Sequence, residues 1–264
     1  MSMGMAIAIA VSVFVAGFFV AGGGDRGISS AEASGGTATW ASPGRLPRGG
    51  EPVDLDPADF TTKIDNPYWP MKPGSRWVYR ETDPDGTRLR VTVTVTGKTK
   101  KIANGVVARV VRDTVTEGGK LVEDTLDWYA QDNEGNIWYL GELTKEYENG
   151  KFKSTEGSFE AGVDGAQPGI AMPANPKVGL AYRQEYYAGK AEDKAEVFSV
   201  AEQVEVPFGH FDDAVMTRDL NPLKPKILEY KFFARGVGPV LVIGVSGGND
   251  REELVRYSRG RSGA

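Results

Sequence analysis

The sequence predicts an all-β fold, an antiparallel meander that curls into a barrel or half-barrel with few short helices. Three observations predict it. Turn signals recur roughly every 8–12 residues, apolar and polar residues alternate between them, and no long stretch follows a helical period. Because an amphipathic strand repeats every two residues and a helix every 3.6, this alternation favours strands. Turns at such short spacing favour antiparallel neighbours.

A hairpin around residues 124–142 is predicted to be central. Two aromatic pairs, at 128–129 and 138–139, flank a turn at Asp132–Gly135. Asp at the first turn position and Gly at the fourth suit a type I turn with a left-handed Gly bulge. With that turn, Trp128 faces Leu140. Aromatic residues on both faces predict that the hairpin is covered on both sides.

The clearest hairpin joins residues 75–82 to residues 87–96 through Asp83-Pro84-Asp85-Gly86. Pairing the turn residues places Trp77 opposite Val93, with valines and leucines on one face and Arg and Thr on the other. The turn register and the hydrophobic period therefore agree, which supports this pairing.

Further strands are predicted from the same alternation at residues 106–117, 120–131, 181–187, 195–206, 214–219, 227–234, 240–245 and 252–257. Between them lies a long Gly- and Pro-rich segment, Ala161–Val178. Loops longer than about 12–15 residues are usually functional or disordered. Because this segment carries the apolar residues Ile170 and Met172, we expect a lid loop that folds over the concave face.

The chain of 264 residues divides into three parts. Residues 1–24 are predicted to be a signal peptide or a membrane anchor, since Met5–Gly22 is apolar and uncharged. Residues 25–56, rich in Gly, Ser and Pro, are expected to form a flexible tether. Residues 57–260 form a single antiparallel β domain. The apolar N-terminal stretch therefore predicts an extracytoplasmic location, in which the protein is secreted or anchored to the outer face of the bacterial cytoplasmic membrane.

Composition excludes several kinds of site. The net charge is −5 and the pI is about 5.2, which argues against a nucleic-acid partner. The absence of cysteine excludes disulfides, thiol nucleophiles and lipidated cysteine, and a single histidine excludes a multi-histidine metal site. We expect no metal and no cofactor.

No residue is predicted to be catalytic. His210 lies in a turn, and the chain has no G-x-S-x-G nucleophile motif, so a surface or packing role is favoured. Turn geometry explains the acids at 83, 85, 132 and 134. Paired carboxylates of a hydrolase remain an open alternative, because acids are abundant and glycosidases need two of them facing a cleft.

An inner-face ligand site is predicted from the turn at Gly118-Gly119. If Glu117 pairs with Lys120, then Asp113 faces Asp124 on a mostly apolar face. Like charges that face each other destabilise a sheet, so such a pair suggests function. The candidate residues are Arg109, Asp113, Asp124, Trp128, Trp138 and Glu142. In the alternative, the turn is one residue longer, which moves one acid into water.

Several motifs carry a family resemblance: WYAQD at 128–132, GNIWYLGE at 135–142, STEGS at 154–158, AGVDG at 161–165, MPANP at 172–176, RQEYY at 183–187 and ARGVG at 234–238. Through them most of residues 60–245 resembles a family of uncharacterised exported bacterial all-β proteins with no established activity. The predicted fold also looks like the half-barrel of bacterial lipoprotein carriers.

These features lead us to expect an exported, non-enzymatic β domain that binds a lipid, another apolar small molecule or a cell-envelope component in a curved sheet. We expect the protein to contact the membrane only through its N-terminal segment. The alternative is a carboxylate-dependent extracytoplasmic hydrolase. A cleft with two convergent, accessible acids favours the hydrolase, and an apolar concavity favours the carrier.

Overall fold

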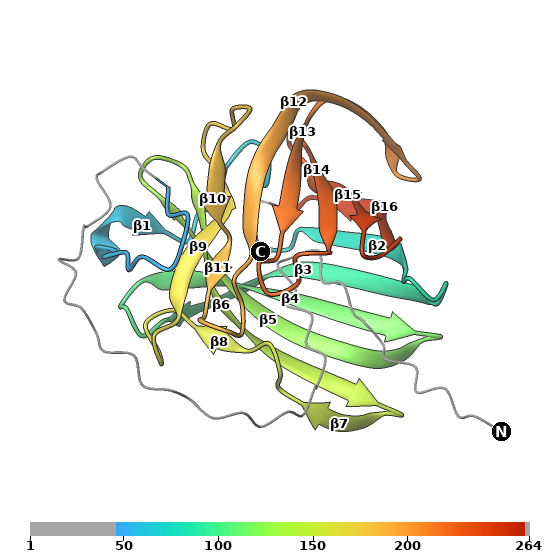
Figure 1. Cartoon of the computed structure of the whole chain (residues 1–264), viewed down its shortest axis with the longest axis horizontal. Coiled ribbons are helices and arrows are strands. Elements are labelled where there is room, and N and C mark those ends of the chain that lie inside the picture. The colour runs from blue at the N-terminus through green and yellow to red at the C-terminus, as the bar shows by residue number, and fades with distance from the viewer. Residues whose placement is uncertain (1–45, 262–264) are drawn as a thin grey trace.

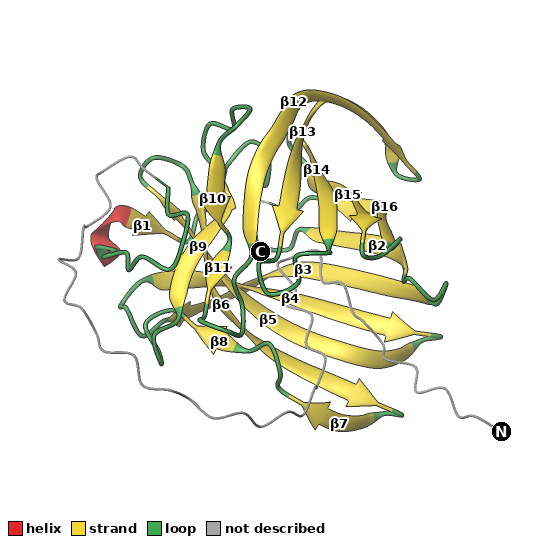
Figure 2. Cartoon of the chain, in the orientation of Figure 1, coloured by secondary structure: helices red, strands yellow, loops and turns green. Residues whose placement is uncertain are grey.

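The computed structural model describes residues 46–261, and the regular secondary structure within them is almost entirely β-strand (Figure 2), which confirms the predicted fold class. A 3-10 turn at Pro57–Asp59 precedes the first strand. The N-terminal strands are β1 (Phe60–Thr61), β2 (Arg76–Thr82), β3 (Arg88–Lys101), β4 (Val107–Glu117), β5 (Lys120–Asp132), β6 (Ile137–Glu148), β7 (Lys151–Ser154), β8 (Phe159–Glu160) and β9 (Gln167–Met172). The C-terminal strands are β10 (Ala181–Arg183), β11 (Glu185–Tyr186), β12 (Lys194–Val206), β13 (Gly209–Leu220), β14 (Leu228–Ala234), β15 (Gly238–Ser246) and β16 (Arg251–Ser258).

Thirteen of these strands follow one another around a nearly closed antiparallel barrel, in the order β10-β12-β13-β14-β15-β16-β2-β3-β4-β5-β6-β9-β11. Two meanders, β2–β6 and β12–β16, form opposite walls (Figure 1). They join where the last strand, β16, pairs with β2, so that Leu254 lies opposite Tyr79. β1 pairs with β5, and β7 and β8 pair with β6.

Aspartate side chains fix the two tight turns that the sequence predicts. Asp83 Oδ1 accepts hydrogen bonds from the amides of Asp85 and Thr87. Asp132 Oδ1 does the same for the amides of residues 134 and 136. Both turns therefore set the register of their strands, and the predicted pairing of Trp77 with Val93 is confirmed.

The barrel closes through one short segment that changes partner. β10 pairs with β12, and β11, one residue later, pairs with β9. The change occurs at Gln184, whose main chain passes so close to Gly169 that a Cβ there would lie 2.2 Å from the Gln184 carbonyl. Only glycine permits this approach. Two residue pairs, Glu185 with Pro168 and Tyr186 with Gln167, are the whole β9–β11 ladder.

The prediction of a lid loop is wrong, because the middle of this segment is a strand of the sheet. β9 pairs with β6, and Ile170 lies opposite Trp138. Ile170 and Met172 are fully buried. Pro168 and Gly169 made the segment look like a loop, but Pro168 stands near the start of a strand, where a missing N–H costs little.

Residues 46–56, the last part of the segment expected to be a tether, lie against the barrel, with Leu46, Val53 and Leu55 partly buried on its core. The Arg183 guanidinium donates to the carbonyl oxygens of Pro168, Gly49 and Glu51 and so ties this segment to the closure. The expected signal peptide or anchor lies outside the described residues. In residues 46–261, no helix has the length and apolarity needed to cross a membrane.

Candidate functional site

Strand register decides which side chains face the barrel interior, because paired residues of antiparallel strands project from the same face. On β3 the buried residues alternate with exposed arginines and half-buried threonines, so the face of Val91 and Val93 is the inner one. Val93 lies opposite Asp113, and Asp113 lies opposite Thr125. Asp113 is therefore an inner residue, and it is fully buried.

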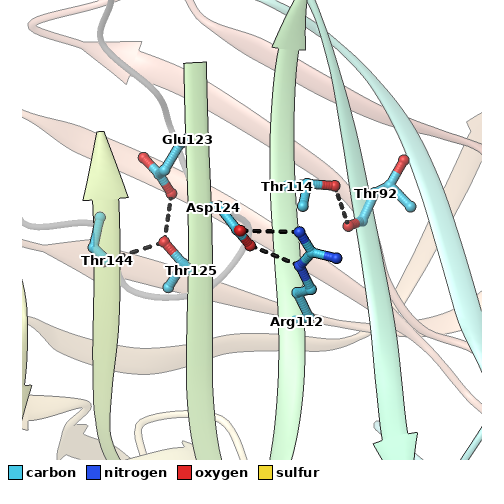
Figure 3. A network of polar contacts seen from close by, with 7 residues as sticks. All are labelled: Thr92, Arg112, Thr114, Glu123, Asp124, Thr125 and Thr144. Carbon is cyan, nitrogen blue, oxygen red and sulfur yellow. Dashed lines mark hydrogen bonds and ion pairs between the residues drawn. The ribbon is translucent and has the colours of Figure 1, made fainter. Parts of the chain in front are cut away.

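The predicted pairing of Asp113 with Asp124 is wrong. Glu117 pairs with Lys120 as expected, but a bulge at Val122 shifts the rest of β5 by one residue. Asp124 consequently lies opposite Thr114 on the outer face, where both its oxygens accept from Arg112, at 2.7 and 2.9 Å (Figure 3). A bulge adds one residue to one strand and so moves this acid outward, the outcome that the alternative register anticipated.

The register shift also places the two tryptophans of the predicted site on the other face of the sheet. Trp128 lies opposite Val110, and Trp138 opposite Ala130, both on the outer face. They are buried there by other parts of the chain. Lys100 Nζ lies 3.9 Å from the Trp128 ring centroid, and Phe60 packs edge-on against Trp138 at 6.1 Å.

Two further predicted residues, Arg109 and Glu142, keep inner positions. Arg109 lies opposite Tyr129, and its guanidinium donates to the main-chain oxygens of Thr62, Thr96 and Lys98. Glu142 lies opposite Asp127. The structure therefore brings Asp113 and Glu142 to one face and separates both from Asp124.

A second bulge places Glu142. Opposite Trp128, β6 contributes both Leu140 and Gly141. Gly141 has φ of 122°, and a Cβ there would lie 2.3 Å from the Phe159 carbonyl oxygen. Glycine is therefore required at this position. The extra residue turns Glu142 onto the same face as Tyr139, three positions earlier.

Acidic side chains from both walls gather on this inner face. Asp219 lies opposite Glu229, and Glu252 lies opposite Glu81. Glu252 also lies opposite Val242, which in turn pairs with Lys231. We call the whole set the acidic belt: Glu81, Asp113, Glu123, Asp127, Glu142, Glu185, Asp193, Asp219, Glu229 and Glu252.

The acidic belt is continuous around the barrel. Repulsion from Glu81 and Asp113 acts on Glu252. Repulsion from Asp113 and Glu142 likewise acts on Asp127. At the closure, Glu185 is repelled by Asp193 and Glu142 together.

Several oxygens of the acidic belt have no hydrogen-bond partner. They are Oδ2 of Asp127, Oε1 of Glu185, Oδ1 of Asp193 and both carboxyl oxygens of Glu252. All four residues are buried, and Asp127 has no exposed surface. Leaving a buried polar atom unpaired costs about 1–3 kcal/mol. A protein that keeps several such atoms on one face holds unused hydrogen-bonding capacity there.

Tyr139 links the two central acids. Its hydroxyl lies 2.7 Å from Glu142 Oε2 and 3.2 Å from Asp127 Oδ1. A phenol has one proton, which serves the shorter contact. The hydroxyl also lies within donating distance of Asp127, whose pKa burial and the neighbouring Glu142 raise well above its ordinary value.

Burial raises the pKa of four belt carboxyls into the neutral range. Desolvation dominates, and it brings the pKa of Glu142 to about 8 and the pKa of Glu123 to about 7, despite hydrogen bonds from Thr144 and Thr125. The Thr125 hydroxyl that bonds Glu123 is visible in Figure 3. Asp193 and Glu229 likewise have pKa values of about 7. These groups carry protons at pH values where surface carboxyls carry none.

Lys231 is the cation of the belt. Its Nζ lies 3.0 Å from Asp219 Oδ2, and both side chains are more than nine-tenths buried. Burial lowers the pKa of Lys231, but Asp219 and Glu229 raise it more, so that the amine stays charged. Asp219 also accepts from Thr217, at 2.6 Å, and from Gln184.

His210 lies on the exposed β12–β13 hairpin, 3.2 Å from Asp212. The described residues contain no group of three or more His, Asp or Glu side chains arranged to hold a metal ion. The belt acids are spread over the face and do not converge on one point.

Sequence reasoning missed Asp127, Glu185, Asp193, Lys231 and Glu252. Asp127 in β5 and Lys231 in β14 each lie between large apolar residues, a pattern that normally assigns the polar side to water. A usable signal was that Leu126 and Trp128, on the opposite side of β5, gave that strand a second face in need of cover.

No protein-family model matches the chain, and no curated protein matches it either. Among solved structures, the chain is similar to one described as a "putative lipoprotein" from Parabacteroides distasonis ATCC 8503. The two share 14% sequence identity, and the match covers 72% of this chain and 98% of the other, with a TM-score of 0.43.

Replacing Tyr139 by Phe tests the link between the central acids. The change removes the hydroxyl that stabilises ionised Glu142, so the pKa of Glu142 is expected to rise above about 8. Stability is expected to fall by about 1–3 kcal/mol, because two buried carboxyls lose a partner. NMR titration of the side-chain carboxyl carbons measures the first effect. A pKa of Glu142 that stays constant or falls contradicts this role of Tyr139.

Proposed function

We propose that the protein is an exported, non-enzymatic β-barrel domain that binds a small ligand on its acidic inner face. One observation carries the proposal: buried oxygens of Asp127, Glu185, Asp193 and Glu252 have no hydrogen-bond partner. Purely structural buried polar groups are normally satisfied. A ligand that donates hydrogen bonds would satisfy these oxygens.

The acidic inner face favours a polar ligand over an apolar one. The sequence favoured a lipid or another apolar molecule, but a face with this many carboxyls would leave them unpaired against an apolar surface, at a large cost. A polar ligand from the cell envelope or its surroundings fits better. Export is supported by the uncharged apolar stretch Met5–Gly22.

The proposal is tested by native mass spectrometry of protein purified from its own host. Wild-type protein is expected to carry a small molecule of defined mass. Glu252→Gln and Asp127→Asn are expected to lose it, and Asp124→Asn, an acid of the outer face, is expected to keep it. Wild-type protein with no bound molecule, and no response to any added small polar compound, would contradict the proposal.

A second candidate, a carboxylate-dependent hydrolase, rests on Asp127 and Glu142. Their oxygens share the Tyr139 hydroxyl, and paired acids with raised pKa values recur in hydrolytic sites. The candidate predicts hydrolysis of a glycoside or ester panel that disappears in Asp127→Asn. The same panel without turnover leaves the binding role as the function of the belt.

A further inference from the structure

We propose that the ligand of the acidic belt is a linear polyamine or an extended molecule with several ammonium groups. This inference rests on the proposed binding function and names the ligand class. Its first support is the charge balance. The belt holds ten carboxyls, against which stand Lys231, paired with Asp219, and Lys224, which acts on Asp193. Carboxyls with raised pKa values carry protons while the belt is empty, and an ammonium group that binds beside them lowers their pKa and takes the place of those protons.

The positions of the unpartnered oxygens support an extended ligand. They belong to Asp127 on β5, Glu185 on β11, Asp193 just before β12 and Glu252 on β16. Neighbouring strands of a sheet lie about 4.8 Å apart, so these oxygens are distributed around the interior. A molecule with ammonium groups spaced along a chain can reach several of them.

A compact metal ion fits the same positions poorly. Calcium takes six to eight oxygen ligands at about 2.3–2.6 Å, all around one point. Within the described part of the chain, no three acidic or histidine side chains are arranged in that way. A neutral polyol would supply donors but no positive charge, and the repulsion among Glu81, Asp113 and Glu252 would persist.

Aromatic rings on the inner face suit the carbon chain of an amine. Tyr129 and Tyr139 lie with ring centroids 5.1 Å apart and carry the same inward orientation as Asp127 and Glu142. Ammonium groups are attracted to aromatic faces, and methylene groups of long amines pack on apolar surface. The side chains beside the acids therefore match the other half of such a ligand.

Entry is expected at the barrel closure. The β9–β11 ladder consists of two residue pairs, whereas β12 and β13 pair along most of their length. Short ladders open locally at lower free energy than long ones. Opening there exposes Glu185, the belt acid carried by β11 itself.

Spermidine is the probe for this inference, and isothermal titration calorimetry with the full chain is the measurement. Buffer near neutral pH and low salt keeps screening weak. Spermidine is expected to bind with a defined stoichiometry, and butylamine, with one ammonium group, more than about tenfold more weakly. Glu252→Gln is expected to weaken spermidine binding about tenfold, as loss of a charge-assisted hydrogen bond implies.

Glu253→Gln is the matched control, because Glu253 follows Glu252 on β16 and bonds Arg80 and Arg251 on the exposed face. It is expected to bind spermidine as the wild type does. Equal binding of butylamine, or equal losses in both variants, would overturn the polyamine assignment. A co-purified molecule without amines, lost in Glu252→Gln, also overturns it but leaves the binding function standing. If nothing binds at all, both proposals fail.

Discussion

The melting temperature of the domain is expected to fall as the pH rises from about 5 to about 8. In the unfolded chain, carboxyls ionise near their ordinary pKa of about 4. In the folded barrel, burial holds the pKa of Glu123 and Asp193 at about 7 and that of Glu142 at about 8. The folded state therefore binds more protons than the unfolded state throughout this interval.

The sign follows from proton linkage, since stability falls with rising pH wherever the folded state binds more protons. The stabilisation is fully present below the unfolded pKa and is lost as the pH passes the folded values. One carboxyl raised from 4.5 to about 7 corresponds to about 3 kcal/mol, or about 6–12 °C in melting temperature for a domain of this size.

Differential scanning fluorimetry across this pH range measures the effect. Glu142→Gln should flatten the slope, because an amide does not titrate. Glu253→Gln, which lies on the exposed face, should preserve it. A melting temperature that is constant or rises between about pH 5 and 8 would show that the belt carboxyls do not hold protons in the folded state.

Replacing Lys231 by Met is expected to destabilise the barrel by about 3–5 kcal/mol, the usual cost of removing one partner of a buried ion pair. Asp219 would lose its cation while Glu229 and Asp193 remain close to it. Methionine keeps most of the volume, so the loss reports charge and not packing. Urea denaturation near neutral pH gives the free energy of unfolding.

Two companion variants make the result specific. Lys231→Met combined with Asp219→Asn should recover part of the loss, because the neutral amide still accepts from Thr217. Lys63→Met removes an ion pair with Asp65 whose side chains are mostly exposed, and it should leave the free energy of unfolding nearly unchanged. A double variant no more stable than Lys231→Met would contradict the electrostatic explanation.

The hairpins were predictable from the sequence because their turns contain characteristic residues. Aspartate followed by glycine fixed the turns at 83–86 and 132–135, and with them the pairing of Trp77 with Val93. Side-chain alternation then located most strands of both meanders. Both signals depend only on residues that are close together in the sequence.

The acidic site was predicted only in part, because neither the strand bulges nor the closure of the barrel leaves a recognisable pattern in the sequence. The bulge at Val122 has neither glycine nor proline, yet it sends Asp124 outward and brings Asp127 inward. Lys231 lies between Tyr230 and Phe232 as if it faced water, and Glu252 lies between two charged residues. They become interior residues only because two walls, distant in sequence, curve toward each other.

The junction between β16 and β2 has a consequence for the order in which the chain folds. It pairs Ser258 with Arg76, so the two walls are joined by β16, the most C-terminal of the described strands. Pairing across such a sequence separation carries a large loop-closure entropy and slows folding. Each meander can form its hairpins early, but the two walls can be joined only after β16 has been synthesised. Truncation before Arg251 should therefore leave two unjoined sheets with open edges, a form prone to aggregation.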